Sequence, residues 1–581
     1  MIKLLKYLKP YWLFTILGPL CMLLEVFGDL MLPSIMATIV DSGVMTGDMD
    51  VVLNSGAQML IWVGIGVFGG IMSGVFSNLA AQNFGNDLRK DVFKSAMSLS
   101  FEQTDQFTTG SLVTRISNDV TQVQNMVMMS MRMLVRTGIL FVGGLVMLNN
   151  IGGQFMVAVG ILLPLILILL YFFIRRVAPL FGSLQKKLDS VNSVVQENVN
   201  GARVVKAYVQ EDYESKRFFK VNQDYSTYSY NVMKILAYLM PLMNIILYGA
   251  IVLIIYIGGS SVSQYYVDPN TGVSAGEVMA AITYITMILM AVLFLAMMFQ
   301  TLTRALASSK RLNEVLNAKP VLVPGSITEG KDVGTIEFKH VSFKYPGASG
   351  DPIINDISFS VKKGDTLAIL GSTGSGKSMI VNLIPRFYDV SDGTILVDGV
   401  NVKDYDFKAL RDKISIVLQK AELFSDTVEN NIRWGKTDAT DEEVISAAKI
   451  AQADTFITSF KDGYKTPIQE KGSSLSGGQK QRISIARALI KKPEILIFDD
   501  STSALDLATE AKLYKALGKS DMTKIIIAQR VASVKGADRI AVIDNGKIVA
   551  LDSHENLMKN CDIYIDIYNS QLKKGSVIND D

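Results

Sequence analysis

The clearest chemical signal in the sequence is a glycine-rich segment that follows the apolar run DTLAIL and leads into a helical pattern. Glycines at these spacings let backbone N–H groups wrap phosphate oxygens at the start of a helix. Lys377 would neutralise the β- and γ-phosphate oxygens, and the Ser378 hydroxyl would bind Mg²⁺. The eight residues form a complete Walker A sequence, which predicts a nucleotide site: Gly371, Ser372, Thr373, Gly374, Ser375, Gly376, Lys377 and Ser378.

A second apolar run, EILIFDD, ends in two adjacent aspartates. A strand with an acid at its carboxyl end is typical of the Walker B position, where the carboxylate holds the metal ion. We therefore expect Asp499 to share Mg²⁺ with Ser378, and Asp500 to lie directly beside that site. Together the two segments predict binding of ATP and Mg²⁺.

The elements that would position these residues lie in 335–570, after a linker at 319–334 that is rich in proline, glycine and charge. Short β-like runs alternate there with helical stretches, which predicts an α/β P-loop domain with a largely parallel sheet. The β-like runs are TIEFKHVSF, DTLAIL, ISIVL, EILIFDD, KIIIAQR and RIAVID. Residues 571–581 are expected to form a C-terminal tail.

Residues 1–318 are of a different kind. The chain of 581 residues is 49% hydrophobic and only 19% charged, which suits a protein that is partly embedded in a membrane. A span needs about 20 apolar residues, and six such runs occur, at 12–33, 57–79, 134–150, 154–174, 236–259 and 278–301. We expect a multi-pass membrane domain whose first span is retained, because no small-residue cleavage site follows it. A net charge of +2 gives no reason to expect nucleic acid as a partner.

The loops between the spans alternate in charge. Segments 34–55, 150–153 and 260–277 contain no Lys or Arg, whereas 82–133 and 175–235 contain many. By the positive-inside rule the N-terminus and the nucleotide domain are cytoplasmic. The two basic connections are far longer than usual inter-helix loops. Because 184–220 keeps apolar residues at helical spacing, we expect the spans to continue as long cytoplasmic helices.

Several ionisable residues fall within or beside the spans. Glu25 and Asp29 share one face of the first span, which indicates either bonds to a neighbouring helix or a polar pathway. Arg132 and Arg136 lie at the inner end of the third span, where snorkelling to the interface would suffice. Asp41 lies at the outer end of the first span. It is either a solvated acid or one side of a salt bridge whose cation comes from a partner chain.

A third motif, Leu475 to Gln479 (LSGGQ), makes the sequence resemble the ATP-binding-cassette (ABC) family, and within it the exporter-type half-transporters. The resemblance implies two such domains that sandwich ATP between the Walker A of one and the signature of the other. Ser476 would cap a helix whose N-terminal dipole faces a γ-phosphate. The resemblance also implies that Gln419 contacts Mg²⁺ and that adenine stacks on Tyr345. The expected nucleotide contacts in the signature are Ser476, Gly477, Gly478 and Gln479.

Two positions depart from the family pattern. Family members that hydrolyse ATP well carry a glutamate after the Walker B aspartate, where this chain has Asp500, and a histidine in the switch loop, where it has Gln529. Aspartate is one methylene shorter, and about 1 Å of misplacement can cost 10²-fold in rate. Glutamine can donate a hydrogen bond but carries no charge. The two histidines, His340 and His554, lie outside the switch segment.

These departures predict an ABC-type ATPase and translocase in which this chain's own site is weakly hydrolytic. The chain would pair with a second half-transporter, supplying an intact signature to the partner's competent site; a slow but working homodimer is the alternative. The favoured cargo is amphipathic small molecules of the multidrug type, exported across a bacterial cell membrane. The flexible side chains of the last span suit such cargo: Met287, Met290, Phe294, Met297, Met298 and Phe299. A lipid or peptide exporter and an ATP-sensing regulatory subunit remain open.

Overall fold

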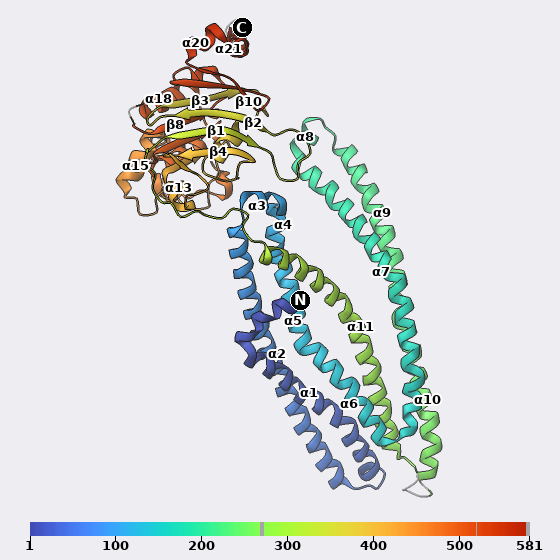
Figure 1. Cartoon of the computed structure of the whole chain (residues 1–581). Coiled ribbons are helices and arrows are strands. Elements are labelled where there is room, and N and C mark those ends of the chain that lie inside the picture. The colour runs from blue at the N-terminus through green and yellow to red at the C-terminus, as the bar shows by residue number, and fades with distance from the viewer. Residues whose placement is uncertain (266, 268–271, 519, 577–581) are drawn as a thin grey trace. The chain divides into compact units, whose positions relative to one another are not determined.

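The computed structural model describes residues 1–265, 267, 272–518 and 520–576 (Figure 1). The side chains of Ala178, Ala296, Met297, Phe299, Gln300, Lys471 and 572–576 lie outside the described part, so the expectations for Met297 and Phe299 do too. The chain divides into two compact units. The membrane unit comprises Met1–Met97 and Thr108–Ala318, and the nucleotide unit comprises Ser98–Phe107 and Lys319–Asp581.

The membrane unit consists of helices joined by short turns. Among the described residues six helical stretches are long and apolar enough to cross a membrane, which confirms the six predicted spans: Ile2–Val44, Met49–Ser98, Thr109–Ile151, Gly153–Asn200, Glu211–Tyr265 and Ala275–Leu295. Their elements are η1 (Ile2–Tyr11), α1 (Trp12–Thr38), η2 (Ile39–Val44), α2 (Met49–Ser98), α4 (Thr109–Thr114), η3 (Arg115–Asp119), α5 (Val120–Met129), η4 (Ser130–Leu134), α6 (Val135–Ile151), η5 (Gly153–Phe155), α7 (Met156–Asn200), α8 (Ala202–Ala207), α9 (Glu211–Ala237), α10 (Leu239–Tyr265) and α11 (Ala275–Asn317).

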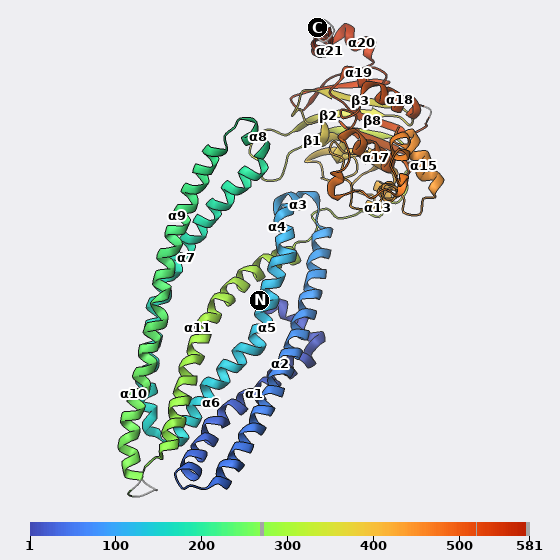
Figure 2. The same cartoon turned by 180° about the vertical axis from the view of Figure 1, so that it is seen from behind.

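Several spans continue as helices far beyond the thickness of a membrane, as the sequence predicted. Helix α7 has 45 residues, a length of roughly 67 Å at 1.5 Å per residue, and a hydrocarbon core is only about 30 Å thick. Helices α7 and α9 lie side by side, joined at their far end by the short α8 (Figures 1 and 2). The two form a long helical arm.

Glycines bring α1 and α2 into backbone contact. A Cβ on Gly69 would lie 2.7 Å from the carbonyl oxygen of Cys21, and one on Gly28 would lie 3.0 Å from that of Trp62. Small residues at a helix interface allow this close approach within a membrane, where van der Waals packing replaces the hydrophobic drive. The pairing therefore depends on side chains being absent at these positions.

The nucleotide unit contains two sheets. The larger has the strand order β10-β9-β3-β8-β7-β6, parallel except for β10, and the smaller is the antiparallel sheet β2-β1-β4-β5. The strands are β1 (Ile336–Phe343), β2 (Ile354–Val361), β3 (Thr366–Gly371), β4 (Asp392–Val397), β5 (Val400–Asn401), β6 (Ile414–Val417), β7 (Ile495–Asp499), β8 (Thr523–Ile527), β9 (Arg539–Asp544) and β10 (Lys547–Asp552).

Helices flank these sheets and connect their strands. They are α12 (Lys377–Leu383), α13 (Phe407–Lys413), α14 (Val428–Arg433), α15 (Asp441–Ile450), α16 (Asp454–Thr458), η6 (Gly463–Lys465), η7 (Glu470–Gly472), α17 (Gly477–Leu489), α18 (Leu507–Leu517), α19 (Val531–Val534), α20 (His554–Asn560) and α21 (Asp562–Ser576). The α/β class and the parallel sheet are as predicted. The run TIEFKHVSF differs, because it forms β1 of the antiparallel sheet, where buried and exposed residues alternate.

One segment from the N-terminal half of the sequence belongs to the nucleotide unit. Helix α3 (Phe101–Phe107) packs its Phe101 ring against Phe387, with ring centroids 4.4 Å apart. The hydroxyl of Tyr388 donates to Asp105 at 2.8 Å, and the amide of Gln103 donates to a backbone carbonyl at Lys319. The connection between the second and third spans thus supplies a helix to the domain that the sequence places at 335–570.

Candidate nucleotide site

The phosphate loop connects β3 to α12 at the carboxyl edge of the parallel sheet. Gly374 and Gly376 have φ angles of +86° and +94°, in the left-handed region that favours glycine. A Cβ on Gly371 would lie 2.3 Å from the carbonyl oxygen of Ile543. The loop therefore requires these glycines, and its N–H groups precede the first turn of α12, where anions bind readily.

Lys377, the first residue of α12, is buried and folds back over the loop. Its Nζ donates to the carbonyl oxygens of Gly371, at 2.9 Å, and Ser372, at 2.6 Å. Burial lowers the pKa of Lys377, and the nearby carboxylates of Asp500 and Asp499 act in the opposite direction. The ammonium thus lies in the loop, beside two acids.

Two oxygen donors that could hold Mg²⁺ meet beside this loop. The Ser378 hydroxyl donates to Oδ1 of Asp499 at 2.7 Å, and burial raises the pKa of the Asp499 carboxyl. Mg²⁺ is usually held by one or two protein oxygens together with phosphate oxygens and water. A hydroxyl and a carboxylate at the mouth of a phosphate loop therefore fit this ion.

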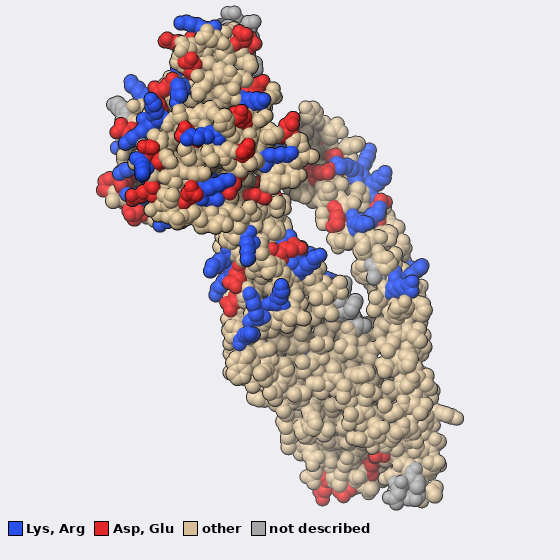
Figure 3. Space-filling view, in the orientation of Figure 1, with Lys and Arg blue, Asp and Glu red and all other residues tan. Residues whose placement is uncertain are grey.

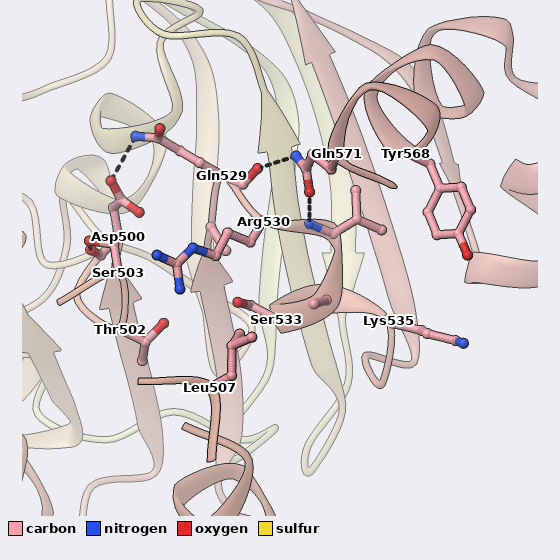
Figure 4. Close-up of a pocket in the computed structure, with 13 residues that line it drawn as sticks. Asp500, Thr502, Ser503, Leu507, Gln529, Arg530, Ser533, Lys535, Tyr568 and Gln571 are labelled. Atoms are coloured by element: carbon pink, nitrogen blue, oxygen red, sulfur yellow. Dashed lines mark hydrogen bonds between the residues drawn. The ribbon is translucent and has the colours of Figure 1, made fainter. Parts of the chain in front are cut away.

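Asp500 is held by two neutral amides. Its Oδ2 accepts a hydrogen bond from Nε2 of Gln529 at 2.8 Å and from Nε2 of Gln419 at 3.1 Å (Figure 4 shows the first). We call Asp500, Gln419 and Gln529 the Asp500 cluster. The family resemblance implied that Gln419 contacts Mg²⁺ and that Asp500 and Gln529 occupy the base and switch positions, and the structure brings the three side chains into direct contact. The bond of Gln419 to Asp500 does not test its expected contact with Mg²⁺, which stays a prediction.

Gln571, which the sequence predicts to lie in the C-terminal tail, holds the segment after β8 with two hydrogen bonds. The side chain of Gln571 on α21 accepts from the N–H of Val531 and donates to the carbonyl of Gln529, both at 2.8 Å (Figure 4). Helical spacing could have indicated this role. Tyr564 is buried in the core, Tyr568 packs against it, and Gln571 follows three residues later on the same face.

The signature lies at the start of α17, where Ser476 and Gln479 form a capping box. The Ser476 hydroxyl accepts from the N–H of Gln479 at 3.3 Å, and the Gln479 side chain accepts from the N–H of Ser476 at 2.9 Å. Ser476 and Gly477 are exposed, and Gly478 lies next to the carbonyl of Ala504, since a Cβ there would be 3.1 Å away. The predicted helix cap is confirmed, with its N-terminus open to solvent.

Tyr345 lies apart from these groups, in an aromatic cluster at the end of the small sheet. Its ring makes edge-to-face contacts with Phe343, at 5.2 Å, and Tyr388, at 5.7 Å. The Tyr345 side chain is 38% exposed. A ring held by two neighbours with its remaining surface free is suited to stacking against a base.

Glu25, Asp29, Arg136 and Asp41 have partners within the membrane unit. The guanidinium of Arg136 on α6 bonds Glu25 and also Asp29, the latter at 2.9 Å, so Arg136 does not snorkel. Both acids thus bond a neighbouring helix. Asp41 accepts from the Ser274 hydroxyl and, at 2.8 Å, from the N–H of Gly276 at the start of α11. Asp41 thus bonds the start of a helix, and a salt bridge from it to a partner chain stays a prediction.

Comparison with known families covers most of the chain. The family described as ABC transporter transmembrane region matches residues 15–303, and the family described as ABC transporter matches residues 354–503. Curated relatives match over nearly their whole length. The chain is 37% identical to the uncharacterized ABC transporter ATP-binding protein YfiB of Bacillus subtilis, with 99% of each chain covered. It is 34% identical to the uncharacterized protein Mb1304c of Mycobacterium bovis, with 98% of each covered.

One relative has a printed activity. It is an ATP-dependent lipid A-core flippase of Legionella pneumophila, 32% identical, with 98% of this chain and 96% of that protein covered. Among solved structures, a bacterial Atm1-family ABC exporter with ATP bound matches with a TM-score of 0.75. At 24% identity over 97% of this chain and 98% of the other, that match shows the fold.

Proposed function

Because the chain belongs to the ABC transporter family and has the exporter fold of a half-transporter, we propose that it is one subunit of a heterodimeric exporter of amphipathic small molecules. In this proposal its own phosphate loop forms a degenerate site that retains ATP for long periods. Its intact signature completes a competent site on a partner chain. The partner supplies the missing glutamate and histidine and carries an altered signature.

The Asp500 cluster is the observation that carries the proposal. The position next to the metal-binding aspartate has a carboxylate one methylene shorter than glutamate, and both neighbouring amides bond to it. A carboxylate that is drawn back and already bonded is poorly placed to polarise a water molecule at a γ-phosphate. Gln529 offers one neutral donor in the place where a histidine could carry charge. The Asp500 cluster therefore supports ATP binding more than ATP hydrolysis.

The remaining groups support ATP binding. Lys377 and the loop N–H groups would hold the phosphates, Tyr345 would stack on adenine, and the exposed α17 N-terminus would face the γ-phosphate bound by the partner. Ser378 and Asp499 would hold Mg²⁺, which neutralises phosphate charge when bound. The 335–570 domain, the 319–334 linker and the tail after 570 remain our proposed boundaries.

The distribution of charge supports a cytoplasmic N-terminus in a cell membrane. In the membrane unit, the face shown in Figure 3 has Lys and Arg at one end, a long uncharged zone, and only acidic residues at the other end. Asp48 and Asp50 lie in the connection between the first two spans, in a segment without Lys or Arg. Because basic residues stay on the cytoplasmic side, the basic end is the inner one.

ATP turnover by the purified chain without a partner tests this proposal. We expect the chain to bind ATP with Mg²⁺ and hydrolyse it slowly, whereas Lys377→Ala should lose binding because the phosphate charge is no longer neutralised. Adding the partner chain should raise turnover and make it sensitive to Ser476→Arg in this chain. Brisk hydrolysis by this chain alone would overturn the heterodimer proposal and leave the exporter assignment intact.

A second candidate cargo is lipid, favoured by the 32% identity to a lipid A-core flippase. Proteoliposomes that contain the assembled transporter would separate the two. ATP-dependent movement of a labelled phospholipid between leaflets, without export of amphipathic dyes, would support the lipid reading. Export of dyes with no lipid movement would support the first.

A further inference from the structure

Arg132 is the one arginine of the third span that the structure leaves unpaired. Its neighbour Arg136, one helical turn further on, bonds both Glu25 and Asp29. The buried Nε of Arg132 has no hydrogen-bond partner, and no ion pair of Arg132 is formed within the described part of the chain. A guanidinium in a span without a counter-charge is costly, and such residues usually face a cavity that supplies one.

Arg132 lines a cavity of about 630 Å³ formed with α1 and α2. Gly70 and Gly74 form part of its wall: a Cβ on Gly70 would lie 2.7 Å from a Glu25 carboxylate oxygen, and one on Gly74 would be in ordinary contact with the Arg132 guanidinium, at 3.7 Å. The rest of the lining is largely apolar and includes Trp62. A volume of this size with few polar groups is typical of small-molecule sites.

We infer that this cavity binds an amphiphile by its anionic head group, with Arg132 as the cation that recognises it. The guanidinium forms bidentate, charge-assisted bonds with phosphate and carboxylate. Glu25 and Asp29 also line the cavity, but their carboxylates bond Arg136, and neither forms an ion pair with Arg132 among the described residues. Trp62 and the apolar wall suit the tail of the molecule. The inference deepens the proposed function, because it names the charge class of the molecule that the membrane unit holds.

Quenching of Trp62 measures this binding directly. The chain has three tryptophans, so Trp12→Phe with Trp434→Phe leaves Trp62 as the sole emitter in the full-length protein. Phosphatidylglycerol with brominated acyl chains should quench it saturably, and brominated phosphatidylcholine should quench at least about tenfold more weakly. Arg132→Gln should weaken the anionic binding about tenfold, Arg132→Lys should weaken it less because it keeps the charge and loses the bidentate bonds, and Arg176→Gln, an exposed arginine of α7, should not change it.

Two further arms identify the source of the anion. Inorganic phosphate that competes with the brominated lipid would show that the head group alone is recognised. An ATP-driven export of dodecyl phosphate that Arg132→Gln abolishes would make the molecule a cargo, whereas saturable binding without export would make it a resident lipid. The latter result would count against the proposed function and leave the inference standing. Quenching that is unsaturable, equal for both lipids or insensitive to Arg132→Gln would overturn the inference, as would a partner-chain acid found on Arg132.

Discussion

The Asp500 cluster and the Arg136 cluster (Arg136 with Glu25 and Asp29) have similar bonding with opposite charges at the centre. In the nucleotide unit one carboxylate accepts from two neutral amides. In the membrane unit one guanidinium donates to two carboxylates. The soluble site borders a cavity of about 800 Å³ that water can enter, whereas the Arg136 cluster lies among apolar spans.

The difference shows how surroundings decide which partner satisfies a charge. Beside the cavity of the nucleotide unit, two amides hold the buried Asp500 carboxylate, and the nearby Lys377 ammonium also acts on its charge. In lipid the same charge requires an opposite charge, because desolvation of an unpaired ion costs several kcal/mol. We therefore expect substitutions in the Asp500 cluster to change ATP turnover, and substitutions that unbalance the charges of the Arg136 cluster to lower stability.

The largest expected effect comes from changing the Asp500 cluster. Asp500→Glu with Gln529→His should raise ATP turnover of the purified chain about 10²-fold. The added methylene moves the carboxylate forward by about 1 Å, and a misplacement of this size can cost 10²-fold in rate. Initial rates at saturating ATP and Mg²⁺ measure it. Asp500→Asn with Gln529→His is the matched control and should show no gain. A double variant that stays as slow as the parent chain would show that the Asp500 cluster does not limit hydrolysis.

The Arg136 cluster should respond in stability. Arg136→Leu leaves two carboxylates without a cation and should cost about 3 kcal/mol, the usual loss when one member of a buried pair is removed. A lowered Tm in detergent measures this. Arg136→Leu with Glu25→Gln and Asp29→Asn removes every charge and should recover most of the loss. If the triple variant is as unstable as the single one, packing and not charge holds α1 to α6.

How well the sequence predicted each feature depends on how far apart along the chain its residues lie. The phosphate loop, the capped signature and the six spans are local patterns, and the structure contains each of them. The position of Asp500 beside the site also followed from its neighbour Asp499. Contacts between distant segments did not follow. Glu25 and Arg136 are 111 residues apart, and no local pattern announces that they meet.

Three further features of the structure did not follow from the sequence. Helix α3 lies in the N-terminal half of the sequence, yet its Phe101 ring packs on Phe387 in the nucleotide unit, and only tertiary contact reveals this. The strand run TIEFKHVSF looked like part of the parallel sheet, because β-propensity does not specify which sheet a strand joins. The role of Gln571 was not predicted, because the predicted tail begins at residue 571. The helical face that positions Gln571 starts earlier, at Tyr564.

Gln571 offers a smaller test of the Asp500 cluster. Gln571→Leu removes both hydrogen bonds to the backbone at Gln529 and Val531, each worth about 1 kcal/mol. Amide hydrogen exchange across 529–533 should quicken at least about fivefold. Ser570→Ala is the control, since among the described residues that hydroxyl bonds its own helix at Ile567. Equal exchange in both variants would mean that α21 does not restrain the segment that carries Gln529.

The smallest effect is expected at an exposed cluster that resembles the Arg136 cluster with its charges reversed. On the nucleotide unit Glu443 bonds both Lys436 and Lys492, and these bonds, with a backbone bond from Thr440, lower its pKa from 4.5 to about 2. A lowered folded-state pKa contributes stability above the unfolded value of 4.5, and that contribution is lost as pH falls from 4.5 towards 2. Glu443→Gln should therefore lower the Tm slightly at pH 7, by under about 3 °C for a solvent-exposed pair, and by less at pH 4. A loss at pH 7 as large as that of Arg136→Leu would break the comparison, because screening by water would then not distinguish the two arrangements.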